Sequence, residues 1–219
     1  MVFHSQAFLG VAGMPGLAAY AGLLRVGALK DGDVVFVSGA AGTVGSLVCQ
    51  IAKAKGHTVI GSAGGARKMA FLKEIGVDHV IDYKAEKDLT AALIAAAPDG
   101  IDVYFDNVGG EHLEAAITAG RPSARIILCG AISTYNMTEM PAGPRNLIMM
   151  IGKQMRMEGI MSFAHMDLMP DFQRDLAQWV EERKVIWKET VFEGIEKAPD
   201  ALMGLFKGEN IGKMLVKLA

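Results

Sequence analysis

The chain has 219 residues, 51% of them hydrophobic and 21% charged, with a formal net charge of −2 at pH 7. This balance, with no basic run, argues against nucleic acid as a partner, and apolar stretches broken by glycine or charge argue against membrane spans. No secretory signal is recognisable, so the expected location is cytoplasmic. The two cysteines, Cys49 and Cys129, form neither a disulfide framework nor a zinc spacing, so no metal is expected.

The N-terminal part is apolar and rich in glycine over residues 8–29. Pro15 is well placed to begin a helix through Leu24. Residues 30–33 (K-D-G-D) form a predicted turn that leads into the first strand. We therefore expect residues 1–30 to be a linking helical segment.

Residues 34–45 (V-V-F-V-S-G-A-A-G-T-V-G) are the centre of the predicted fold. A buried strand, a turn of small residues and a helix with apolar residues at helical spacing are typical of a dinucleotide-binding unit. Ala40 stands where the first glycine of G-x-G-x-x-G would be, while Gly42 and Gly45 occupy the other two places. Similar turns close ordinary βα units, so this turn alone is a weak indication.

Strands and helices then alternate along the chain. Further strands are predicted at 58–63, 78–82, 101–105 and 125–129, with helices at 67–75, 87–97 and 109–119. This alternation predicts an α/β fold with a parallel, doubly wound Rossmann sheet. A sixth strand at 157–161 and an amphipathic helix at 170–183 complete a predicted dinucleotide-binding domain over residues 31–184. The last segment, 185–219, is predicted as strand, helix (198–207) and strand.

Most of the 14 methionines lie between Met137 and Met169. Methionine fills irregular gaps in cores, and it also forms adaptable walls of apolar pockets. For any single methionine the first interpretation is favoured.

The end of the second strand indicates which cofactor is bound. An acid about twenty residues after the glycine turn would accept hydrogen bonds from the ribose of NAD. Here Gly64 and Gly65 occupy that place, and Arg67 and Lys68 follow. Two cations and no carboxylate favour the 2′-phosphate of NADP. The alternative is that both are solvated charges in the first turn of a helix, where cations oppose the helix dipole.

Several longer runs carry a family resemblance. They are residues 13–20 (G-M-P-G-L-A-A-Y), 40–45 (A-A-G-T-V-G), 104–111 (Y-F-D-N-V-G-G-E), 129–136 (C-G-A-I-S-T-Y-N) and 207–213 (K-G-E-N-I-G-K). With these runs the chain resembles the zinc-independent medium-chain dehydrogenase/reductases. It is most similar to the NADPH-dependent prostaglandin reductase and 2-alkenal reductase branch, which includes curcumin-reductase-like enzymes.

The resemblance implies roles for residues at matching positions. The implied pyrophosphate site is Gly42, Thr43, Val44 and Gly45. Lys68 and Tyr83 would contact the 2′-phosphate, and Asn107 would lie beside the cofactor. The implied nicotinamide contacts are Cys129, Ala131, Ile132, Ser133 and Tyr135, with Ile160, Met161, Ser162 and Asn210 closing over that end.

The implied reaction is hydride transfer from NADPH to the β-carbon of an α,β-unsaturated ketone or aldehyde. Tyr135 would lie near the reacting carbonyl and donate a hydrogen bond to the enolate that forms. Without the resemblance, Tyr135 is a loop aromatic packed on apolar surface. Two alternatives stay open: a quinone reductase of the same superfamily, and a non-catalytic NADP-binding module.

The second alternative arises because family members carry an N-terminal barrel-like catalytic domain before the segment matched here. We expect that domain to be absent and residues 185–219 to be the part that would pack on it. The apolar residues thereby uncovered predict association, as does the family's tendency to dimerise through the sheet edge, so a homodimer is expected. These residues are Phe8, Leu9, Val11, Met214, Leu215 and Val216.

Other constellations are interpreted as structural. Tyr83 and Lys87 fit the Tyr-x-x-x-Lys pair of short-chain dehydrogenases but come too soon after the glycine turn. Glu111 and Glu114 are expected to serve solubility. The five histidines lack metal spacing and a Ser or Cys partner, and are expected at the surface or at helix ends: His4, His57, His79, His112 and His165.

Overall fold

A six-stranded parallel sheet forms the centre of the computed structural model, which describes residues 3–139 and 141–218. The strand order is β3-β2-β1-β4-β5-β6, so the predicted doubly wound sheet is confirmed. The strands are β1 (Val34–Val37), β2 (Thr58–Ala63), β3 (His79–Asp82), β4 (Ile101–Asp106), β5 (Gly120–Leu128) and β6 (Arg156–Gly159).

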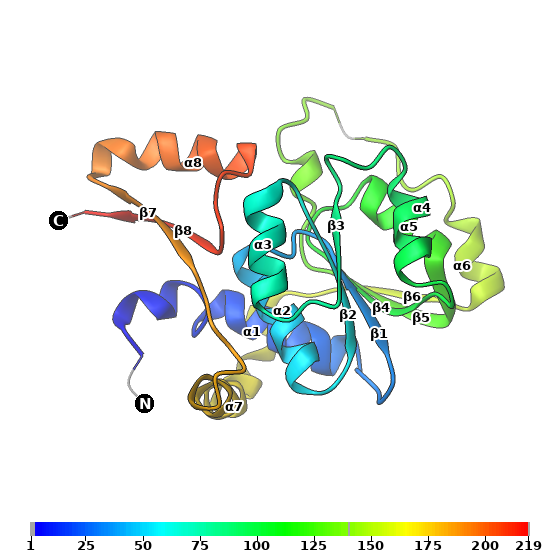
Figure 1. Ribbon diagram of the computed structural model, residues 1–219, viewed down its shortest axis with the longest axis horizontal. Coiled ribbons are helices and arrows are strands. Elements are labelled where there is room, and N and C mark those ends of the chain that lie inside the picture. The colour runs from blue at the N-terminus through cyan, green and yellow to red at the C-terminus, as the bar shows by residue number, and fades with distance from the viewer. Residues whose placement is uncertain (1–2, 140, 219) are drawn as a thin grey trace.

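Helices cover both faces of this sheet (Figure 1). The α-helices are α1 (Met14–Ala21), α2 (Thr43–Ala54), α3 (Ala66–Glu74), α4 (Leu89–Ala96), α5 (Glu111–Ala119), α6 (Ile148–Lys153), α7 (Met169–Glu181) and α8 (Ala198–Lys207). Short helical turns are η1 (Ser5–Leu9), η2 (Gly22–Val26), η3 (Ile132–Thr134), η4 (Ser162–Leu168) and η5 (Ile195–Lys197). None of the helices within the described ranges has the length and apolar character needed to cross a membrane.

The two faces of the sheet carry separate apolar cores. Helices α1, α2, α3 and α7 pack on one face, where Val35, Val37 and Phe105 of the central strands are fully buried. On the other face α4 and α5 cover Phe36 and Tyr104, whose rings stack at 5.0 Å. Val35, Phe36 and Val37 of β1 thus point to alternate faces and are all buried, as expected for a parallel strand covered on both sides.

A second, two-stranded parallel sheet is formed by β7 (Glu189–Glu193) and β8 (Lys213–Lys217), with α8 beside it. Two contacts tie this C-terminal unit to α2 and the turn before it. The side-chain amide of Gln50 donates to the carbonyl of Ile186 (2.9 Å) and accepts from its N–H (2.8 Å). The N–H of Gly212 donates to the carbonyl of Ala41 at 2.8 Å.

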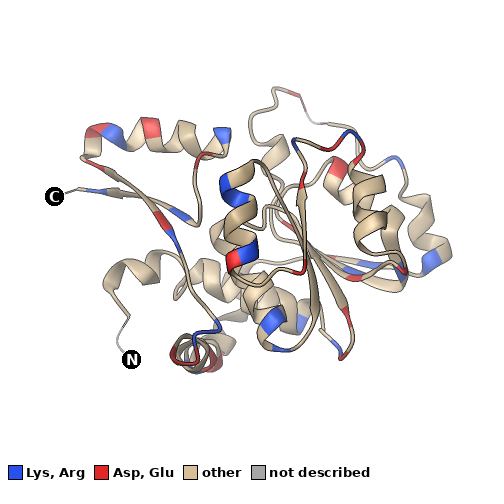
Figure 2. Ribbon diagram, in the orientation of Figure 1, with Lys and Arg blue, Asp and Glu red and all other residues tan. Residues whose placement is uncertain are grey.

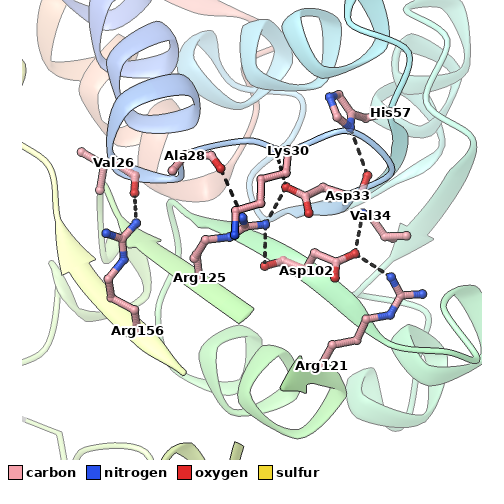
Figure 3. Close-up of polar contacts among 10 residues, drawn as sticks. All are labelled: Val26, Ala28, Lys30, Asp33, Val34, His57, Asp102, Arg121, Arg125 and Arg156. Atoms are coloured by element: carbon pink, nitrogen blue, oxygen red, sulfur yellow. Dashed lines mark hydrogen bonds and ion pairs between the residues drawn. The ribbon is translucent and has the colours of Figure 1, made fainter. Parts of the chain in front are cut away.

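The sheet end opposite the glycine turn holds a buried ion pair (Figure 3). The guanidinium of Arg125, on β5, lies 2.5 Å from the Asp33 carboxylate, and both side chains are 9% exposed. The same guanidinium donates to the carbonyl of Ala28. This pair joins the chain before β1 to the middle of β5.

Several element boundaries differ from expectation. β5 begins at Gly120 rather than at residue 125, because a register shift against β4 lets the strand continue. β7 begins at Glu189 rather than at residue 185, because Gln50 holds the preceding residues in place of a strand partner. Helix α6 is an element that the sequence analysis missed.

The expectation that Val11 is an uncovered apolar residue is wrong. Its side chain is 4% exposed and belongs to the core beneath α1, whereas Phe8 and Leu9 are exposed. Of the methionines, Met149, Met150, Met155 and Met157 pack against the second core, which agrees with their favoured interpretation as core filler. Met140 lies outside the described residues.

Candidate functional site

A cleft of about 1220 Å³ opens at the carboxyl ends of β1, β2, β4 and β5. It spans the point where the strand order reverses between β1 and β4, which is where open parallel sheets bind ligands. The end of α8 and the residues after it line its other side. Most residues implied by the resemblance line this cleft: Gly42, Thr43, Val44, Gly45, Lys68, Tyr83, Asn107, Cys129, Ala131, Ile132, Ser133, Tyr135 and Asn210.

The glycine turn brings backbone to the floor of the cleft. A Cβ on Gly45 would lie 2.5 Å from the carbonyl oxygen of Gly39, so only glycine lets α2 begin this close to β1. No side chain caps the N-terminus of α2, where Gly42 is the N-cap residue. The first-turn N–H groups therefore face the cleft without a side-chain acceptor, as a pyrophosphate site requires.

One end of the cleft is cationic. Lys68, in the first turn of α3, lines it together with Lys84, which follows β3. Burial, and secondarily the charge of Lys84, lowers the pKa of Lys68. Arg67 is exposed and lies outside the lining. Figure 2 shows basic positions at the start of α3 and at the end of α8. Lys68 and Lys207 at these positions both line the cleft.

A hydrogen-bond network beneath the cleft holds the segment after β4. The carboxylate of Asp106, 1% exposed, accepts from the hydroxyl of Tyr104 (2.7 Å) and the N–H groups of Val108 (2.9 Å) and Gly109 (2.7 Å). Asn107 donates its side-chain amide to the carbonyl of Ser38 at 2.8 Å, across the switch point. Burial raises the pKa of Asp106, while the donors around it favour the ionised form.

The other end of the cleft is formed by the loop after β5. Cys129 donates its N–H to the carbonyl of Asp106 at 2.9 Å, and its thiol has a pKa raised to about 11 by burial and by the Asp106 charge. Tyr135 is 60% exposed and lies back over the loop, where its hydroxyl oxygen accepts from the N–H of Ala131 at 3.3 Å. Its ring is therefore not packed away on apolar surface.

Three of the predicted site residues lie outside the cleft lining: Ile160, Met161 and Ser162. Ile160 packs against the first core, and its Cδ1 approaches Gly22. Met161 is exposed. Asn210 is buried in the lining, and its side-chain amide donates to the carbonyl of Gly212 at 2.8 Å, which shapes the loop opposite the glycine turn.

Comparison with known proteins identifies the family. A profile of the zinc-binding dehydrogenase family matches residues 43–182. Mouse prostaglandin reductase 1 is 50% identical over 95% of this chain, and tobacco NADP(+)-dependent 2-alkenal reductase is 46% identical over 97%. The structure of CurA from Vibrio vulnificus in complex with NADPH superposes with a TM-score of 0.93, at 42% identity over 99% of this chain.

The chain belongs to the zinc-binding dehydrogenase family. Within it, these relatives place the chain in the zinc-independent branch of prostaglandin and 2-alkenal reductases, as the sequence runs indicated. The chain spans 64% of the mouse protein, 62% of the tobacco protein and 66% of the Vibrio protein. In residues 3–139 and 141–218, no group of three or more His, Cys, Asp or Glu side chains could hold a metal ion.

The expectation for the histidines is wrong at His57, which is buried beyond the end of α2. At His112 it is half right, because this residue lies at a helix end, in the first turn of α5, but has a serine partner. His57 and His112 are both buried, 5% exposed. The Nε2 of His112 lies 3.0 Å from the hydroxyl of Ser62, and its ring meets the edge of Tyr83 at 5.2 Å. Both His112 and Tyr83 line the cleft, so the candidate site contains a serine-bonded histidine that sequence reasoning missed.

The role expected for Glu114 is also incomplete. Its carboxylate accepts from the backbone N–H (3.0 Å) and the guanidinium (2.9 Å) of Arg145. Glu114 thereby anchors the segment before α6 to helix α5, next to the cleft. No spacing in the sequence joins these two positions, because the pair is formed by the return of a long loop.

Proposed function

We propose that this chain is the cofactor-binding part of an NADPH-dependent oxidoreductase that reduces the carbon–carbon double bond of α,β-unsaturated ketones or aldehydes. The observation that carries the proposal is the cationic end of the cleft, where Lys68 and Lys84 line the site and β2 is followed by Gly64 and Gly65 instead of an acid. Such an end suits the 2′-phosphate of NADP and not the ribose hydroxyl of NAD. The names of the mouse and tobacco relatives and the NADPH complex of the Vibrio protein support it.

The residues in the cleft fit this cofactor from end to end. The N–H groups at residues 43–45 would hold the pyrophosphate, Lys68 and Tyr83 the 2′-phosphate, and Asn107 and the loop from Cys129 the nicotinamide side. When bound, NADPH supplies a hydride equivalent. The protein holds the acceptor next to the nicotinamide and excludes water from it. Positioning of this kind is the main contribution that a protein makes to a cofactor reaction.

Tyr135 is the proposed catalytic residue. Its hydroxyl oxygen already accepts from the N–H of Ala131, and the hydroxyl donates no hydrogen bond to another described residue. The proton is therefore available to a substrate oxygen at the rim of the cleft. Reduction at the β-carbon places negative charge on the carbonyl oxygen, and a positioned donor there lowers the barrier.

A titration of cofactor affinity tests the proposal. NADPH should bind the 219-residue chain more tightly than NADH in a fluorescence titration. Lys68→Ala should cost about 1–3 kcal/mol of NADPH affinity, on the scale of a charged hydrogen bond, and leave NADH nearly unchanged. Lys87→Ala, at an exposed position outside the cleft, is the matched control. Equal affinity of the wild-type chain for both cofactors would overturn the proposal.

A second candidate function is NADP binding without turnover. It is favoured by the exposure of Tyr135, since no described segment covers this end of the cleft. We therefore expect weak reduction of 2-alkenals or unsaturated ketones by this chain, and strong reduction by a protein that adds the remaining third of its relatives' length. In that longer protein Tyr135→Phe should remove much of the activity. Robust turnover by the 219-residue chain would contradict this expectation.

The domain division is part of the same proposal. In this division, the linking helical segment is residues 1–30 and the cofactor-binding domain is residues 31–184. The C-terminal segment, residues 185–219, would pack on a catalytic domain. The separate two-stranded sheet of β7 and β8 supports the last assignment. A quinone as acceptor, a homodimer and a cytoplasmic location stay predictions.

A further inference from the structure

Lys84 occupies a place in the cleft that depends on Gly64. A Cβ on Gly64 would lie 2.9–3.0 Å from Cγ, Cδ and Cε of Lys84, so the aliphatic stem of the lysine lies across the bare backbone of that glycine. Gly64 is the residue that directly follows β2. Its missing side chain therefore lets Lys84 lie across the end of β2, where an acid would bind the ribose of NAD.

Asp82 joins the two turns that carry these residues. Its Oδ1 accepts from the N–H of Gly65 at 3.0 Å and from the N–H of Lys84 at 3.1 Å. The pairing of β2 with β3 sets Asp82 opposite Ala63, so the carboxylate lies between the two strand ends. The turn before α3 and the turn after β3 are thus held to one oxygen atom.

Lys84 and Lys68 form a pair of like charges. The positive charge of Lys84 acts on Lys68 strongly enough to lower its pKa, after the larger effect of burial. Within the described ranges neither ammonium group forms an ion pair with a carboxylate. Two neighbouring cations without a counter-ion repel each other, and a dianion between them removes that repulsion.

We infer that Lys84 is a second cation for the 2′-phosphate of NADPH, and that Asp82 is the positioning residue that holds it beside Lys68. This inference rests on the proposed function and extends it, because it assigns cofactor choice to a pair of lysines, one in the first turn of α3 and one after β3. Lys84 supplies charge from β3 while Lys68 supplies it from α3. A side chain on Gly64 would displace the aliphatic stem of Lys84 from this position.

The test uses two probes that differ by the 2′-phosphate alone, adenosine 2′,5′-bisphosphate and adenosine 5′-monophosphate, with calorimetric titration of the 219-residue chain. Lys84→Ala should weaken binding of the bisphosphate about three- to tenfold, the range of a charged contact that is partly screened by solvent, and leave the monophosphate within about twofold. Lys84→Arg should retain most of the affinity. Lys87→Ala, with an exposed lysine three residues away, should change neither.

Asp82 is tested by rescue. Asp82→Ala removes the shared acceptor and should weaken the bisphosphate more than the monophosphate. Asp82→Asn keeps an oxygen acceptor at that place, and should restore the preference. A role of Asp82 in folding alone would weaken both probes equally, which circular dichroism and thermal melting of each variant would show.

The outcomes separate the inference from the proposed function. If the wild-type chain prefers the bisphosphate but Lys84→Ala keeps the whole of that preference, the inference is overturned and the NADPH proposal stands. If the wild-type chain binds both probes equally or binds neither, the NADPH proposal fails and the inference fails with it. If Lys84→Ala loses the preference and Lys84→Arg keeps it, both are supported.

Discussion

Removing the charge of Asp33 should destabilise the fold without altering the cofactor site. In Asp33→Asn the guanidinium of Arg125 stays buried, 9% exposed, but loses the carboxylate at 2.5 Å (Figure 3). Breaking a buried pair on one side costs about 3–5 kcal/mol, and the remaining hydrogen bonds to the carbonyls of Ala28 and Asp102 favour the lower end, about 3 kcal/mol. In the wild-type chain the N–H of Lys30 donates to the Asp33 carboxylate at 2.7 Å. The asparagine oxygen can accept the same hydrogen bond, so the turn before β1 is kept.

Urea and thermal unfolding measure this loss. For a chain of this length about 3 kcal/mol corresponds to a fall in Tm of about 6–12 °C. Arg121→Met is the control, since its pair with Asp102 at the same sheet end is partly exposed, 33% and 21%, and should cost about 1 kcal/mol or less. Asp33→Asn combined with Arg125→Met should recover part of the loss, because the unpaired charge is gone. A loss below about 1 kcal/mol for Asp33→Asn would refute the reasoning.

Three further predictions concern titrating and exposed groups. Burial lowers the pKa of His112 from 6.5 to about 4, so between those values the unfolded chain binds more protons and the free energy of unfolding falls as pH falls; His112→Gln should lessen that slope in urea titrations at pH 5 and 7. Cys129, with a pKa raised to about 11, should react with iodoacetamide at pH 7 about a hundredfold more slowly than an exposed cysteine and faster at pH 10, by mass spectrometry, and equal rates would contradict this. Exposed Phe8 and Leu9 favour association, so light scattering should show a dimer or larger species, and a clean monomer at high concentration would count against it.

Where local signals agree, the sequence predicts elements closely. Helix α8 has the predicted bounds, because a proline stands in its first turn and Gly208, at φ 71°, ends it in the left-handed conformation. The second strand was also predicted to the residue, since a polar Thr58 and the pair Gly64–Gly65 bound a run of small and apolar residues. In both cases residues next to the element determine where it begins and ends.

Elements whose limits depend on distant partners were predicted less well. β5 extends back to Gly120 through Arg121, Pro122 and Ser123, residues that do not favour a strand. It does so because pairing with β4 supplies hydrogen bonds that local preference does not suggest. Arg125 within that strand is buried against Asp33, 92 residues earlier in the chain. The pattern of apolar residues along the sequence cannot predict such a distant pair. Composition likewise gave no sign that His57 and His112 would be buried.

The candidate site likewise has a part that local sequence predicts and a part that depends on distant partners. Its floor could be predicted, because Gly42, Gly45 and Lys68 follow one another along a single strand, turn, helix and strand. Lys84 and Asp82 could not be assigned by that reasoning, since their role follows from the register that sets Asp82 opposite Ala63. A parallel pair of strands brings together residues separated by a whole helix, and only the three-dimensional pairing shows which turn meets which. On the inference made above, the choice between NADP and NAD in this chain depends on two strand ends at once, and the missing acid after β2 is half of the signal.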